Sequence, residues 1–167
     1  MRAKRHSPVE GSFVAVDPTP EQYRGVTPYL IVQDGNAALD FYRRAFNAEQ
    51  VERIDAPGGK IGHAEVKIGG GIVMLADAMP DRGYNGPNVY GGTPVSLVFY
   101  TQDVDATFAQ AIAAGAEELM PVEDKFYGDR MGSVKDPFGH IWHIATHVED
   151  VSPEEMQRRA EAMGGQG

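Results

Sequence analysis

An internal repeat is the feature that most constrains how this chain can fold. Two stretches register at a spacing of 68 residues: Asn47-Ala48-Glu49 falls on Gly115-Ala116-Glu117, Val66-Lys67 on Val134-Lys135, and Gly71 on Gly139. An ordered series of this kind indicates two copies of one supersecondary unit. The alternative is that two unrelated segments share only their glycine turns. The number of matches in one order favours duplication.

Each copy is expected to contain a strand, a helix and three further strands. In the first copy, residues 29–32 form an apolar run typical of a strand, and residues 35–46 carry apolar side chains at helical spacing. Three more strands are expected at 51–54, 60–68 and 72–76, separated by glycine-rich turns. The second copy repeats this order, with strands at 95–100, 117–122, 129–135 and 140–146 and a helix at 104–114.

The predicted fold class is therefore α+β, with two tandem βαβββ modules in one domain. The domain spans 25–150, its modules are 25–78 and 94–148, and the proline- and glycine-rich residues 79–93 are expected to link them. Residues 1–24 show no sustained periodicity and predict a flexible arm.

Residues 151–167 are expected to form a C-terminal helix and tail. Ser152 can accept a hydrogen bond from the first helical turn, Pro153 suits the first helical position, and Glu155 can complete a capping box. Arg158 and Arg159 on this helix are expected to face solvent.

Composition excludes several classes of function. The 15 basic residues against 24 acidic residues give a net charge of -9, which would repel a nucleic acid backbone. The absence of cysteine excludes disulfides, thiolate nucleophiles and cysteine-ligated zinc. No apolar run is long enough to cross a bilayer or to serve as a secretory signal. We expect a soluble cytoplasmic protein without nucleic acid or membrane partners.

Several motifs resemble one known family. They are Pro28-Tyr29-Leu30, Phe41-Tyr42, Gly62-His63-Ala64-Glu65 and the stretch from Asp136-Pro137-Phe138-Gly139-His140 through Trp142 to Val151. Together they resemble the vicinal oxygen chelate superfamily, which includes glyoxalase I, bleomycin-resistance proteins and extradiol dioxygenases, and within it the PhnB-like branch. The resemblance implies curled sheets whose modules face each other around a cup for a metal ion or a small molecule. It also implies a homodimer, and an exposed sheet edge that needs cover supports this expectation.

The resemblance also says where a metal ion would be held. In metal-bearing members of the family, ligands come from the first and last strands of each module. Here the corresponding positions carry Thr27, Ser96, Leu75 and His143. One imidazole is fewer than the three or four protein ligands that zinc requires. We therefore expect no metal cofactor.

A second pattern keeps a metal-dependent alternative open. His63 and Glu65 lie two residues apart on an expected strand and so share a face. With His143 they could hold one divalent metal ion in a glyoxalase-type lyase or isomerase, in which Glu65 or His143 is the catalytic proton shuttle. The other interpretation is that His63 and Glu65 are ordinary hydrogen-bonded sheet residues.

The leading expectation is a protein that binds a small molecule in the cup, with or without a reaction there. Aromatic side chains would provide flat walls, and polar groups would orient the ligand. Arg130 could meet an anionic group, or could form a surface ion pair. The residues expected to bind the ligand are Thr27, His63, Glu65, Ser96, Tyr127, Arg130, Trp142 and His143.

Overall fold

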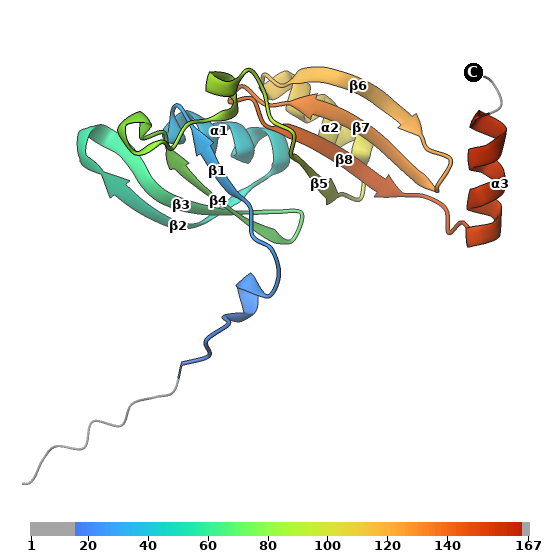
Figure 1. Ribbon diagram of the computed structural model, residues 1–167, viewed down its shortest axis with the longest axis horizontal. Helices are drawn as coiled ribbons and strands as arrows, with labels where there is room; N and C mark the ends of the chain where they lie inside the picture. Colours follow the sequence, from blue (N-terminus) through green and yellow to red (C-terminus); the bar gives the residue numbers. More distant parts are fainter. Residues whose placement is uncertain (1–15, 165–167) are drawn as a thin grey trace, which may run out of the picture.

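The computed structural model describes residues 16–164 and contains two four-stranded mixed sheets lying side by side (Figure 1). The first sheet has the order β1-β4-β3-β2 and the second β5-β8-β7-β6. The first four strands are β1 (Tyr29–Val32), β2 (Glu49–Ala56), β3 (Lys60–Ile68) and β4 (Gly71–Asp77). The other four are β5 (Ser96–Tyr100), β6 (Glu117–Asp124), β7 (Asp129–Lys135) and β8 (Ile141–His147). The helices are α1 (Gly35–Phe46), α2 (Val104–Ala114) and α3 (Pro153–Gly164).

The predicted α+β duplication with a C-terminal helix is confirmed by this topology. Each module runs strand, helix and three strands, and its first and last strands pair in parallel. Residues 1–15 of the predicted arm and 165–167 of the predicted tail lie outside the described residues.

Equivalent residues begin and end the first two helices. The side chains of Asp34 and Asp103 accept 2.9 Å hydrogen bonds from the backbone amides three residues on, which satisfies a free donor of the first turn. Asn47 and Gly115 then end α1 and α2 in the left-handed conformation. The duplication therefore extends to the local signals that set helix length.

The repeat changes register at the last turn of each module. Lys67 pairs with Ile72 and Lys135 pairs with Ile141, so the spacing rises from 68 to 69 residues beyond this turn. The match of Gly71 with Gly139 is wrong, because the second module has one more residue in its turn. A shift of one residue exchanges the two faces of a strand. His143 therefore corresponds to Met74, and Leu75 is a fully buried core residue instead.

The helices α1 and α2 pack against each other and cover one face of the sheets (Figure 1). Aromatic side chains from both modules meet between the helices and the sheets, with Phe99 partly buried and the others buried: Phe41, Tyr42, Phe46, Phe99, Phe138 and Trp142. The opposite face of each sheet, which we call the open face, carries exposed apolar side chains such as Tyr29, Val98 and Met120. The duplicated helices thus close one side of the molecule and leave the other side accessible.

The third helix lies at the far end of the second sheet, away from the first module (Figure 1). Ser152 Oγ accepts a 3.2 Å hydrogen bond from the amide of Glu155, as its sequence predicts. Arg158 is exposed, but the expectation that Arg159 faces solvent is wrong. Arg159 pairs with Glu149 at 2.7 Å and donates to the carbonyl of Phe126 at 3.2 Å, which ties the helix to the second module. Between residues 16 and 164, no helix is both long and apolar enough to cross a bilayer.

Candidate functional site

A polar cluster lies on the open face of the first sheet. Glu65 on β3 is only 2% exposed, and the hydroxyl of Tyr23 lies 2.8 Å from both of its carboxylate oxygens. His63 Nε2 lies 3.2 Å from Glu65 Oε1, and Tyr29 Oη lies 3.1 Å from His63 Nδ1. Alternation along β3 explains the grouping, because His63 and Glu65 point to one face while Ala64 and Val66 are buried on the other.

Tyr23 belongs to the segment that the sequence predicts as an arm. Residues Glu21–Tyr23 form a single 3-10 turn before β1. The pKa of Tyr23 is raised, first by its hydrogen bond to Glu65 and then by burial. The phenol therefore stays protonated at neutral pH and donates to the carboxylate.

The β2–β3 ladder has two irregularities, one between Gln50 and Glu52 and one between Ile54 and Asp55. The second of them brings Glu52 to the same cluster. Asp55 pairs with Ile61 and Ile54 pairs with His63, so Gly62 is an extra residue in β3. This bulge places Glu52 directly opposite Glu65. Glu52, His63 and Glu65 each offer one ligand atom, and these atoms lie within 4.8 Å of one another. Sequence reasoning missed Glu52 because an unbulged hairpin would pair it with Ala64, on the other face.

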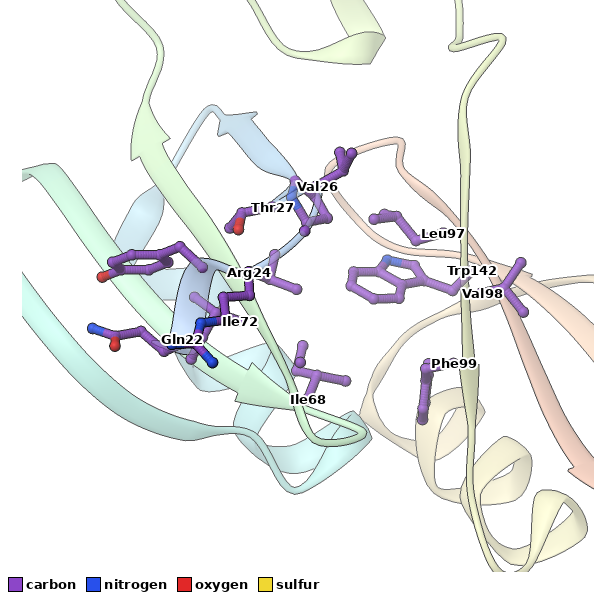
Figure 2. Close-up of a pocket in the computed structure, with 15 residues that line it drawn as sticks. Gln22, Arg24, Val26, Thr27, Ile68, Ile72, Leu97, Val98, Phe99 and Trp142 are labelled. Atoms are coloured by element: carbon purple, nitrogen blue, oxygen red, sulfur yellow. The ribbon is translucent and has the colours of Figure 1, made fainter. Parts of the chain in front are cut away.

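A cavity of about 320 Å³ lies at the junction of the two modules. Figure 2 shows Thr27, Ile68 and Ile72 on one side and Leu97, Phe99 and Trp142 on the other. The segment from Gln22 to Pro28 borders the cavity, so the same stretch that carries Tyr23 also shapes this space. Of the predicted ligand-binding residues, Thr27 and Trp142 are brought together here.

A second cavity of about 440 Å³ lies where β1 meets the connector between the modules. Its lining includes Tyr29, Tyr90, Pro94 and His140. His140 is buried, its Nε2 lies 3.3 Å from the carbonyl of Ile31, and burial lowers its pKa. A neutral imidazole therefore forms part of the wall of this cavity at neutral pH.

The open face of the second sheet holds two further histidine contacts. His143 Nδ1 lies 2.6 Å from Ser133 Oγ. His147 lies between two carboxylates, with Nδ1 2.8 Å from Asp129 and Nε2 3.0 Å from Asp150. Hydrogen bonds to Asp129 first, and then to Asp150, raise the pKa of His147. His143 is thus on a different sheet from His63 and Glu65, and it contacts the neutral hydroxyl of Ser133.

Three further predicted ligand-binding residues line neither cavity. Ser96 is exposed at the start of β5. Tyr127 Oη contacts Met131 Sδ at 3.6 Å, near the turn between β6 and β7. Arg130 forms ion pairs with Asp105 at 2.7 Å and Asp124 at 3.0 Å, so its guanidinium is already neutralised. The surface ion-pair interpretation of Arg130 therefore describes this conformation.

The chain is similar to known proteins over most of its length. The sequence model of one protein family, the Glyoxalase/Bleomycin resistance protein/Dioxygenase superfamily, matches residues 24–144. The protein Rv0887c of Mycobacterium tuberculosis is 40% identical over 161 residues, covering 95% of this chain and 91% of that protein. YjdN of Escherichia coli is 29% identical over 143 residues, covering 71% and 92%.

Solved structures show the same fold. TioX from Micromonospora sp. ML1 superposes with a TM-score of 0.59 at 30% identity, covering 77% of this chain and 99% of that chain. The fosfomycin resistance protein FosX from Listeria monocytogenes superposes with a TM-score of 0.57 at 20% identity, covering 82% and 98%. Because the family match spans most of the chain, the protein belongs to the Glyoxalase/Bleomycin resistance protein/Dioxygenase superfamily, as its resemblance to the vicinal oxygen chelate proteins implies.

Proposed function

We propose that the protein binds a small molecule in the cup at the junction of its modules, without an ion at the family's usual positions. The observation that carries this proposal is the cavity of about 320 Å³ whose walls come from both copies of the repeat. Its volume falls within the range of small-molecule sites, which are mostly apolar with a few polar groups. The usual ligand positions carry Thr27, Met74, Ser96 and His143, a set with one strong nitrogen ligand.

The chemistry of the walls indicates the kind of ligand. Ile72, Leu97 and Phe99 offer apolar surface, while Thr27 and Arg24 offer a hydroxyl and a guanidinium at the margin. A molecule with a flat apolar body and one polar or anionic end fits this distribution. FosX from Listeria monocytogenes has been crystallised with Mn(II) and 1S,2S-dihydroxypropylphosphonic acid, which supports small-molecule binding as a use of the fold.

A second copy of the chain is the proposed cover for the open faces. The edge strands β2 and β6 are exposed along almost their whole length, and Val98 and Tyr100 expose more than half of their surface. Pairing such a surface removes apolar area from water. A mass in solution of twice the 18.1 kDa of one chain is the expected result.

We also propose membership of the PhnB-like branch and a cytoplasmic location.

Ligand binding can be tested with thermal shifts. Aromatic, glycopeptide-like and thiol-conjugate compounds are added to the full-length protein, and we expect one class to raise the Tm. A ligand at one hundred times its Kd stabilises by about 2.7 kcal/mol, which corresponds to a shift of roughly 5–10 °C in a chain of this size. Emission from Trp142, the only tryptophan, reports on the same cavity.

A matched pair of substitutions localises the effect. Val98→Trp fills the cavity and should remove the shift, while Val51→Trp, at a similarly exposed strand position outside both cavities, should leave it unchanged. The proposal fails when none of the compounds raises the Tm, or when Val98→Trp retains the full shift.

A metal-dependent lyase or isomerase is the second candidate function. The contact between His63 and Glu65 favours it, since an imidazole beside a carboxylate can transfer a proton near neutral pH. His143 lies on the other sheet, so it would take part only if a second copy brought it near. Turnover of a hemithioacetal by metal-supplemented protein, lost in Glu65→Gln, is the expected result. No turnover with nickel, zinc, manganese or iron present rejects this candidate.

A further inference from the structure

We propose that Glu52, His63 and Glu65 form a divalent cation site on the open face of the first sheet. This site differs from the positions of Thr27, Met74, Ser96 and His143, and it lies on β2 and β3 instead of the first and last strands of the modules. The inference does not depend on ligand binding at the module junction.

The first argument is the placement of two carboxylates opposite each other. Glu52 and Glu65 are direct cross-strand partners. Like charges at such positions repel and destabilise a sheet. Among the ion pairs of residues 16–164, none joins either glutamate to a lysine or an arginine. A divalent cation between the two carboxylates would turn this repulsion into attraction.

The second argument is the burial of Glu65. Its side chain is 3% exposed, and a buried carboxylate is costly unless a positive charge or several donors compensate it. Its partners are the neutral hydroxyl of Tyr23 and the imidazole of His63, which is charged only when protonated. Neither partner supplies a permanent positive charge.

The third argument is the orientation of His63. Tyr29 Oη lies 3.1 Å from Nδ1, on the side of the ring away from the carboxylates. Tyr29 Oη can accept a hydrogen bond from Nδ1–H, and in that tautomer the Nε2 lone pair is free for a metal, as in many metal centres. Nε2 lies 3.2 Å from Glu65 Oε1, and a ring nitrogen of His63 lies within 4.8 Å of a Glu52 oxygen. Tyr29 therefore has the position of a residue that orients a ligand.

The donor set indicates which ions would bind. One imidazole nitrogen and two carboxylate oxygens suit manganese, cobalt, nickel and zinc better than calcium or a soft ion. Three protein ligands leave coordination positions open, as in sites that also bind water or a small molecule. The Tyr23 hydroxyl lies 2.8 Å from Glu65 Oε1, one of the proposed ligand oxygens.

The test uses the full-length chain without an affinity tag, stripped with EDTA and titrated calorimetrically with Zn²⁺ and Mn²⁺. We expect one ion per chain for at least one of the two. Glu52→Gln and His63→Gln should each weaken binding by about tenfold or more, because even loss of an orienting group outside the ligand shell costs 10–100-fold. Glu52→Gln removes the repulsion with Glu65, so its Tm in EDTA should be at least that of the wild type, and it should lose the rise that the metal produces.

A control substitution completes the experiment. Glu117→Gln, at an exposed glutamate of the second module paired with Lys135, should bind the ion like the wild type. The proposal is overturned when the wild type binds neither ion, when Glu52→Gln binds as tightly as the wild type, or when Glu117→Gln weakens binding equally.

Discussion

The hydroxyl of Tyr42 on α1 donates a 2.8 Å hydrogen bond to Oδ2 of Asp136, in the turn between β7 and β8. The same oxygen accepts a 3.0 Å hydrogen bond from Trp142 Nε1, and Oδ1 accepts from the amides of Phe138 and His140. Burial and the neighbouring Asp136 charge raise the pKa of Tyr42 well above its usual value. A helix of the first module thus donates one of the four hydrogen bonds that stabilise a buried carboxylate in the second module.

Removing this hydroxyl should weaken the whole domain. Tyr42→Phe leaves the buried carboxylate one donor short, and we expect the free energy of unfolding to fall by about 1–3 kcal/mol. Urea denaturation measures the change. Tyr127→Phe is the control, since its hydroxyl contacts only Met131 Sδ at 3.6 Å and its loss should have little effect. A Tyr42→Phe protein as stable as the wild type would contradict the role of this bond.

The ion pairs of His147 should make stability depend on pH. Its folded-state pKa is raised above the unfolded value of about 6.5. Their contribution is therefore fully present below pH ~6.5 and is lost as the pH rises through the folded-state pKa. We expect His147→Gln to lower the Tm at pH 5.5 and to lower it less at pH 9, where the imidazole is neutral in both states. An equal difference at the two pH values would reject this explanation.

Gly128 should be intolerant of a side chain. Its φ is +96°, and an added Cβ would collide with the carbonyl oxygen of Glu149. The carbonyl of Gly128 also accepts from the amides of Val148 and Glu149, so the two segments cannot separate without losing these bonds.

Gly70→Ala separates conformational strain from collision. Gly70 also has a positive φ, +87°, but no atom lies within 4 Å of the added Cβ. We expect Gly70→Ala to cost about 1–2 kcal/mol from backbone strain alone and Gly128→Ala to cost more. Thermal unfolding of both variants checks the order, and equal losses would mean that the collision has no effect.

Much of the fold could be predicted from local sequence signals. Asp34 and Asp103 mark the helix starts, Asn47 and Gly115 mark their ends, and the glycine turns separate the strands. These features could be predicted because each depends on the conformational preference of one residue or on a short apolar period. The cap at Ser152 belongs to the same class.

Long-range contacts were harder to predict. Arg159 is an exposed helical residue by pattern, yet it pairs with Glu149 because α3 folds back toward the second module. Tyr23 lies in a stretch without periodicity, yet it contacts Glu65, 42 residues away in the chain. No local rule connects residues so far apart.

The sequence by itself determined the duplicated βαβββ order, the helix ends and the alternation that gives His63 and Glu65 one face, because these depend on near neighbours and on side-chain period. Only the tertiary structure decided which residues join them. The bulge at Gly62 places Glu52 opposite Glu65, and a longer turn aligns His143 with Met74. The physical reason is that one extra residue in a strand or turn exchanges the faces of the residues that follow until another irregularity restores the register, as at Val51 in β2. The energy of packing the whole sheet decides where such residues are accommodated.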